Sequence, residues 1–101
     1  MKIIIIDDDP IVCESLRMIT EMGSKKSNGE EITVVAIGHD GNEALSLYHR
    51  HQPDILLLDI QMKEKNGLDA AEEVLARYPE AKILFRTTFL DNEYIISALR
   101  M

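Results

Sequence analysis

Four short, continuous apolar runs are the feature that most limits how this chain can fold. They occupy residues 3–6, 32–37, 55–58 and 83–85, and they are rich in Ile, Val and Leu. A strand that is apolar at successive positions is buried on both faces, which is typical of a parallel sheet covered by helices on both sides. The runs therefore predict four strands of a central parallel sheet.

Helical patterns lie between and after these runs. In the first, Asp9 is suited to cap a helix, Pro10 to stand in its first turn, and Gly23 to end it. Four apolar residues of this helix lie close to one face: Val12, Leu16, Ile19 and Met22. The polar, Gly- and Ser-containing residues 23–31 that follow predict a loop.

Three more helices are expected. The second opens at Asp40, with Glu43 three residues on as in a capping box, and ends before Pro53. The third covers residues 68–78, and the fourth begins near Asp91. Four strand–helix repeats with right-handed crossovers predict an α/β, doubly wound parallel sheet. If the first and third strands are neighbours, the sheet has the flavodoxin-like order 2-1-3-4.

Length and charge narrow the classes of protein further. The 101 residues suffice for one domain, and 18 acidic against 11 basic residues leave a net charge of −7. This balance argues against direct binding of DNA or RNA and favours a cation site or a basic partner. No apolar run approaches the ~18 residues of a membrane span. Cys13 is the single cysteine, which favours a cytoplasmic protein and a packing or surface role for this thiol.

The residues that follow the runs carry the candidate chemistry, because open α/β sheets bind ligands beyond the carboxyl ends of their strands. After the first, third and fourth runs stand Asp7, Asp8 and Asp9, then Asp59, then Thr87 and Thr88. Adjacent first and third strands would bring these side chains to one place at the edge of the sheet.

The acidic residues in this set point to a cation. Clustered carboxylates repel one another unless a cation joins them, and Mg²⁺ is a hard ion that prefers oxygen ligands. A carboxylate beside that ion can attack a phosphoryl donor, and a nearby hydroxyl can bond a phosphoryl oxygen. Simpler explanations compete: Asp9 suits a helix cap, and Asp7 and Asp8 could merely be solvated at a strand end. Asp59 is the hardest to assign to the surface, because it follows four apolar residues.

Several segments together resemble a known family, the receiver (phosphoacceptor) domain of bacterial two-component response regulators. In order along the chain they are IIIIDDDPIV, HDGNEAL, QPDILLLDIQM, NGLDAAEEV, AKILFRTTF and DNEYIISALR. The TTF segment and the EYIISALR pattern look most like receivers of LuxR/NarL-type transcription regulators. The resemblance covers nearly the whole chain.

The resemblance implies a role for each candidate residue. Asp59 matches the aspartate that is phosphorylated from a histidine kinase. Asp8 would bind Mg²⁺ directly and Asp7 through water, and the backbone carbonyl of Gln61 would complete the metal site. Thr87 matches the switch hydroxyl that moves toward the phosphoryl group, so Asp59 and Thr87 would carry the reaction.

The resemblance also implies partners and a domain boundary. A sensor histidine kinase would supply the phosphoryl group, the receiver would form a homodimer, and DNA would be bound only through an output domain. Residues 1–101 are expected to form the receiver domain without the last strand and helix of the family, and without the output domain. The loop after Asp59 departs from the usual pattern at Lys63, Glu64 and Lys65.

Two other functions remain open from the sequence. One is an interaction module that has the receiver fold but is not phosphorylated. The other is a small phosphohydrolase that forms an aspartyl-phosphate, because Asp7 and Asp9 make an Asp-x-Asp pattern after the first strand. Identifying the labelled aspartate, Asp7 or Asp59, would separate the phosphohydrolase from the receiver.

Overall fold

The centre of the molecule is a parallel sheet. A computed structural model describes residues 1–26, 31–62 and 64–86 of the chain. The strands of the described part are β1 (Lys2–Ile6), β2 (Thr33–Gly38), β3 (Ile55–Asp59) and β4 (Ile83–Arg86). They pair in parallel in the order β2-β1-β3-β4. The predicted flavodoxin-like, doubly wound α/β fold is therefore confirmed.

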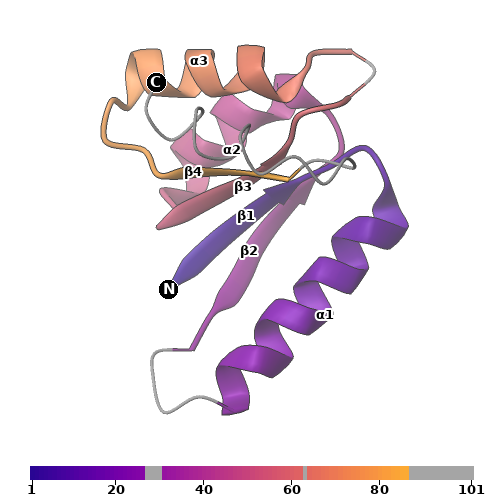
Figure 1. Ribbon diagram of the computed structural model, residues 1–101. Coiled ribbons are helices and arrows are strands. Elements are labelled where there is room, and N and C mark those ends of the chain that lie inside the picture. The colour runs from indigo at the N-terminus through magenta and orange to yellow at the C-terminus, as the bar shows by residue number, and fades with distance from the viewer. Residues whose placement is uncertain (27–30, 63, 87–101) are drawn as a thin grey trace.

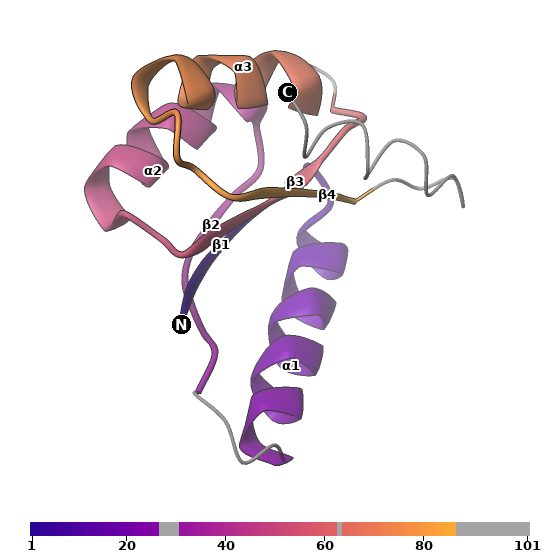
Figure 2. The same ribbon diagram turned by 60° about the vertical axis from the view of Figure 1, so that its left-hand side comes forward.

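Helices cover both faces of the sheet. They are α1 (Pro10–Lys26), the short 3₁₀ turn η1 (Gly41–Glu43), α2 (Ala44–His51) and α3 (Gly67–Arg77). Figure 1 shows α1 on one side of the sheet, with α2 and α3 together on the other, and Figure 2 shows the same layers from a second direction. Within the described ranges, no helix is long and apolar enough to cross a membrane.

The core consists of two layers, one on each face of the sheet. Alternate strand residues point to opposite faces, so a continuous apolar run supplies both layers at once. The larger layer packs under α2 and α3 and contains Ile4, Ile6, Leu56, Leu58, Ile83 and Phe85 from the strands. The smaller layer, around Ile3, Ile5 and Cys13, packs under α1. This double burial is the reason the runs have no polar alternation.

The first helix differs from its prediction in length and in the face that it buries. It continues through Gly23 to Lys26, so the expected end at Gly23 is wrong. Cys13 is buried and Leu16 packs beside it, whereas Ile19 and Met22 are 69% and 54% exposed. The face turned to the sheet near the helix end carries a carboxylate of Glu21, which accepts a hydrogen bond from the Val34 backbone N–H.

The other predicted boundaries lie close to the observed ones. The Asp40 side chain caps η1, which leads directly into α2. The second helix ends at His51, and Gln52 then adopts a left-handed conformation with φ 46° before Pro53.

The third helix begins one residue earlier than predicted, because the Asn66 side chain accepts a hydrogen bond from the Asp69 backbone N–H as its cap. The fourth predicted helix, near Asp91, lies outside the described residues.

Candidate functional site

Three charged residues form one row at the carboxyl edge of the sheet. Asp7 directly follows β1, Asp59 ends β3, and Arg86 ends β4. The registers place Ile6 opposite Leu58 and Asp59 opposite Arg86, so the row runs across three adjacent strands. Because the three strands are parallel, their carboxyl ends lie at the same edge of the sheet, and residues far apart in sequence become neighbours there.

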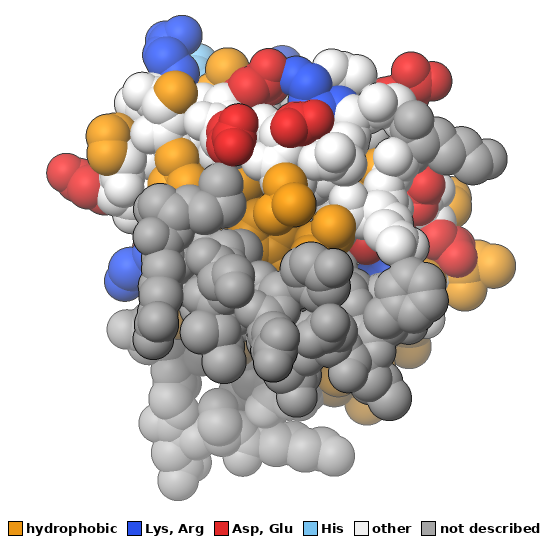
Figure 3. All heavy atoms as spheres, turned by 45° about the horizontal axis from the view of Figure 1, so that its top comes forward, with side chains coloured by type: hydrophobic (Ala, Val, Ile, Leu, Met, Phe, Trp, Pro, Cys, Tyr) orange, Lys and Arg blue, Asp and Glu red, His pale blue; other side chains and the backbone are white. Residues whose placement is uncertain are grey.

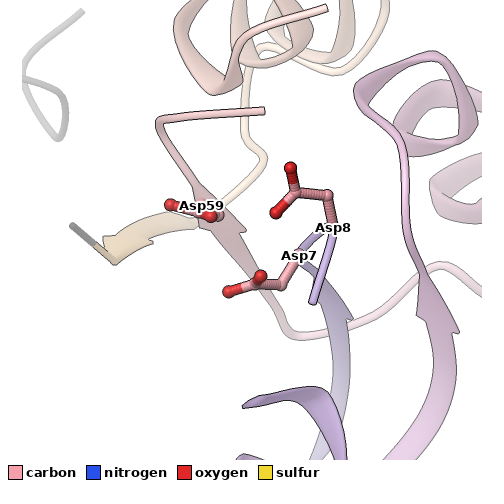
Figure 4. Close-up of side chains that lie close together, drawn as sticks. All are labelled: Asp7, Asp8 and Asp59. Carbon is pink, nitrogen blue, oxygen red and sulfur yellow. The ribbon is translucent and has the colours of Figure 1, made fainter. Parts of the chain in front are cut away.

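The predicted acidic cluster is present beyond the ends of β1 and β3. One carboxylate oxygen from each of Asp7, Asp8 and Asp59 lies within 4.8 Å of the others. Figure 4 shows the three side chains gathered in the space beyond the two strands. Asp7 and Asp59 are 1% and 3% exposed, whereas Asp8 is exposed. Two buried carboxylates at this separation repel each other, and a nearby positive charge favours the ionised form of both.

Asp7 is held by hydrogen bonds on both of its oxygens. Its Oδ1 accepts the Asp9 backbone N–H at 3.0 Å. Its Oδ2 accepts two donors from one guanidinium, Arg86 Nε at 3.0 Å and Arg86 Nη2 at 2.5 Å. The Asp7 carboxylate is thus fixed in orientation and is paired with a cation that the protein itself supplies.

Asp59 lies in a less favourable environment for a negative charge. Burial raises the pKa of Asp59 above its ordinary value, and the charge of Asp7 raises it further. The Gln61 backbone N–H, which bonds Asp59 Oδ1 at 3.3 Å, and the Arg86 guanidinium, 3.8 Å from Oδ2, oppose that rise. A divalent cation at the cluster would favour the ionised carboxylate that a nucleophile requires.

An open pocket lies beside the acidic cluster, between the end of β1 and the segment that joins β3 to α3. Its lining residues are Asp8, Ile60, Gln61, Met62, Asn66 and Leu68. The pocket therefore brings one carboxylate of the cluster next to backbone and side-chain oxygens. This arrangement leaves space for the water molecules that Mg²⁺ retains when proteins bind it.

The donor set fits a hard divalent cation. Carboxylate oxygens from Asp7, Asp8 and Asp59 are the ligand type that Mg²⁺ prefers, and they stand close enough to share one ion. Gln61, predicted to contribute its backbone carbonyl, lines the same pocket as Asp8. The role of each of these residues toward an ion stays a prediction.

Other candidate residues fall outside this cluster. Asp9 is exposed, and its Oδ1 accepts the Ile11 backbone N–H at 2.9 Å, which is the capping role weighed for it from the sequence. Thr87, the predicted switch, and Thr88 lie outside the described residues. The buried thiol of Cys13 contacts the backbone carbonyl of Asp7 and the ring of His39 behind the site.

Arg86 is a charged residue of the site that is not among the sequence-predicted ones. Its side chain lies against two of the predicted acids, whereas the sequence pattern directs attention to the neighbouring Thr87. The available signal is a charged residue at the end of an otherwise apolar run, residues 83–86. The parallel register makes that position equivalent to Asp59.

Comparison with known proteins identifies the family. Residues 3–101 match the family model described as the response regulator receiver domain. The chain belongs to this family. The resemblance proposed from the six sequence segments is thereby confirmed for nearly the full length of the chain.

Relatives of this receiver include regulatory proteins of bacteria. It is 34% identical over 100 residues to the transcriptional regulatory protein DegU of Brevibacillus brevis, matching 99% of this chain and 40% of DegU. It is 38% identical over 101 residues to the oxygen regulatory protein NreC of Staphylococcus epidermidis, matching 99% of this chain and 44% of NreC. The chain thus spans less than half the length of these curated relatives.

Solved structures agree with the LuxR/NarL subfamily. A two-component response regulator of the LuxR family from Aurantimonas sp. superposes with a TM-score of 0.82 at 28% identity. The match covers 98% of this chain and 66% of that one. The response regulator domain of Thermotoga maritima CheB has the same fold, with a TM-score of 0.82 at 22% identity.

The distribution of charged side chains on the surface of the receiver is consistent with its acidic composition. On the face shown in Figure 3, acidic and basic side chains of the described residues are interspersed, and the basic ones form no continuous patch. With a net charge of −7 for the whole chain, this face offers little attraction to nucleic acid phosphates.

Proposed function

We propose that this receiver accepts a phosphoryl group from a sensor histidine kinase on Asp59, with Mg²⁺ as cofactor. One observation carries the proposal: in a chain of the receiver family, Asp59 is buried within 4.8 Å of two further carboxylates at the carboxyl edge of the sheet. Such a site serves a signalling domain, which changes its own state rather than turning over a substrate.

The residues act together in one displacement. An oxygen of Asp59 attacks phosphorus, a P–O bond forms, and the bond between phosphorus and the kinase histidine nitrogen breaks with its electron pair passing to that nitrogen. The Gln61 backbone N–H holds the Asp59 carboxylate in one orientation for the attack. Mg²⁺, held by Asp8 and Asp59 directly, by Asp7 through water and by the Gln61 carbonyl, would neutralise charge on the transferred oxygens.

The output of this switch is transcription regulation. The relatives DegU and NreC are regulatory proteins more than twice as long as this chain. We therefore propose that residues 1–101 form a receiver domain whose phosphorylation moves the Thr87 hydroxyl, promotes a homodimer and controls a DNA-binding domain outside this chain. A cytoplasmic location stays a prediction from the lone Cys13.

Labelling with a small phospho-donor tests the proposal. The chain is incubated with phosphoramidate and Mg²⁺, and its intact mass is measured for the addition of one phosphoryl group. Asp59→Asn should abolish the addition. Asp54→Asn, at the opposite end of β3 and exposed, is the matched control and should be labelled like the unchanged chain. Equal labelling of Asp59→Asn would reject Asp59 as the acceptor.

The same experiment addresses the two alternatives. A phosphohydrolase would carry the label on Asp7 and use Asp9 as its proton donor, yet the Asp9 carboxylate bonds the first turn of α1. Label on Asp7, mapped by peptide mass spectrometry, would favour the phosphohydrolase. An interaction module would take no label under any of these conditions.

A further inference from the structure

In the described part of the chain, Arg86 supplies a positive charge to the acidic cluster. It is the last residue of β4, and both its Nε and its Nη2 donate to Asp7 Oδ2, at 3.0 Å and 2.5 Å. The same Nη2 lies 3.8 Å from Asp59 Oδ2. One guanidinium therefore lies against both of the buried acids of the site.

We propose that Arg86 is a resident counter-ion of the acidic cluster and competes with the divalent cation for it. In the absence of the ion, Arg86 neutralises Asp7, and ion binding requires this pair to weaken. This inference rests on the proposed function, in which the divalent cation is the cofactor for phosphorylation of Asp59.

The pair is built into the fold rather than formed by chance on the surface. The side chain of Asp7 is 2% exposed and that of Arg86 is 26% exposed, so neither charge is fully hydrated. The strand register that places Arg86 opposite Asp59 also fixes the position of the Arg86 backbone, from which the guanidinium extends toward the acids. By contrast, both side chains of the Arg17–Glu14 pair on α1 are about half exposed, and pairs of that kind contribute little.

Competition follows from charge and from shared atoms. Three carboxylates carry a formal charge of −3, and one guanidinium reduces it to −2 before any ion arrives. The guanidinium also occupies Asp7 Oδ2, one of the two oxygens that Asp7 can offer to an ion. A divalent ion entering here meets a positive charge a few ångströms away, in a site where screening by water is incomplete.

The test is a calorimetric titration with MgCl₂ of the unchanged chain, Arg86→Gln and Arg86→Lys. Removing the positive charge in Arg86→Gln should tighten Mg²⁺ binding about tenfold. Arg86→Lys keeps the charge and should bind Mg²⁺ within about threefold of the unchanged chain. Arg17→Gln removes an exposed arginine far from the site and is the matched control, with no expected change.

The proposal would be overturned if Arg86→Gln bound Mg²⁺ with an affinity equal to or lower than that of the unchanged chain. If neither binds Mg²⁺, Arg86 is not the barrier and the inference also fails. Binding by Arg86→Gln alone would support it. Labelling of Asp59 by phosphoramidate, measured in parallel on the same variants, reports the proposed function independently of the Mg²⁺ affinity.

A second measurement needs no variant, which matters if Arg86→Gln does not fold with Asp7 left unpaired. In the unchanged chain, the NMR signal of the Arg86 Nε–H reports its hydrogen bond to Asp7 directly. Saturating Mg²⁺ should shift this signal and increase its exchange with water, whereas the Arg17 Nε–H should not respond. An Arg86 signal that stays constant through the Mg²⁺ titration would reject competition.

Discussion

Gly67 lies so close to the backbone of Asp59 that a Cβ atom added there would stand 2.2 Å from the Asp59 carbonyl oxygen. The Gly67 N–H also donates to the carbonyl of Ile60 at 2.8 Å. The first turn of α3 is therefore packed directly on the end of β3. Only glycine permits this approach, and the approach holds the backbone that carries the proposed phosphoacceptor.

Gly67→Ala should destabilise the receiver, because the new methyl group forces the start of α3 away from β3. The expected loss is about 1–3 kcal/mol in the free energy of unfolding, measured by urea denaturation. Gly23→Ala is the control: nothing lies within 4 Å of its added Cβ, and it sits inside α1. That change should stabilise the protein by about 0.4–1 kcal/mol. Equal effects of the two substitutions would contradict the proposed close contact.

Asp59→Asn should stabilise the protein in the absence of divalent cations near neutral pH. Burial and Asp7 raise the pKa of Asp59, so the folded state holds the Asp59 proton more tightly than the unfolded state does. Protonated Asp59 therefore contributes its full stabilisation below about pH 3.8, the pKa of this carboxyl in the unfolded chain. The stabilisation is lost as the pH rises through the higher pKa that Asp59 has in the folded protein. The advantage of Asn over Asp should therefore grow with pH across that window.

Chemical denaturation of Asp59→Asn and of the unchanged chain, with a chelator present, would measure the difference in their free energies of unfolding. The measurements should run from about pH 3.5, just below the ordinary pKa of aspartate, to neutrality. Asp54→Asn is the comparison, since that residue is exposed and far from the acidic cluster. A difference between Asp59→Asn and the unchanged chain that is constant with pH would show that Asp59 titrates at the same pH in the folded and unfolded states.

Asn66→Ala should remove the cap of α3. The Asn66 side chain accepts the Asp69 backbone N–H at 2.9 Å, and losing such a cap costs about 1 kcal/mol. Asn66→Ser keeps an oxygen acceptor and should recover most of the loss. Thermal or urea unfolding of the three proteins measures the effect, and an alanine variant as stable as the serine variant would argue against the cap.

The Cys13 thiol should react slowly with alkylating reagents in the folded protein. It is 1% exposed, and burial together with the charges of Asp7 and Asp9 raises its pKa to about 11. At pH 8 the reactive thiolate is therefore scarce as well as inaccessible. Iodoacetamide labelling followed by mass spectrometry should be fast in urea and slow without it. Rapid labelling of the folded chain would contradict the burial of this side chain.

The strands and the acids of the site are predictable because they depend on local pattern. Each apolar run ends within one residue of the end of a strand, so the amino-acid sequence is enough to assign Asp7 and Asp59 to strand ends. The end of α1 is not predictable in this way. Gly23 is a common helix terminator, yet here the helix continues past it, and Glu21 bonds the backbone of β2.

Arg86 shows the limit of the sequence most clearly. Read along the chain, it is one charged residue after Phe85, and nothing nearby suggests a partner. Its partner Asp7 lies 79 residues away and becomes its neighbour only because β1, β3 and β4 align in parallel register. Composition and periodicity carry no information about which side chains such alignment brings within hydrogen-bonding distance.

The amino-acid sequence by itself determined the layered parallel fold, the identity of the family and the three acids at the sheet edge. The fold and the acids follow from the continuous apolar runs and from the residues that stand directly after them, whereas the family follows from the resemblance of six sequence segments to receiver domains. Only the tertiary structure decided that Asp7 is paired with Arg86, that Gly67 packs against Asp59, and that Ile19 and Met22 of α1 are exposed. Each of these depends on distances between segments remote in sequence, which strand register and helix packing set together.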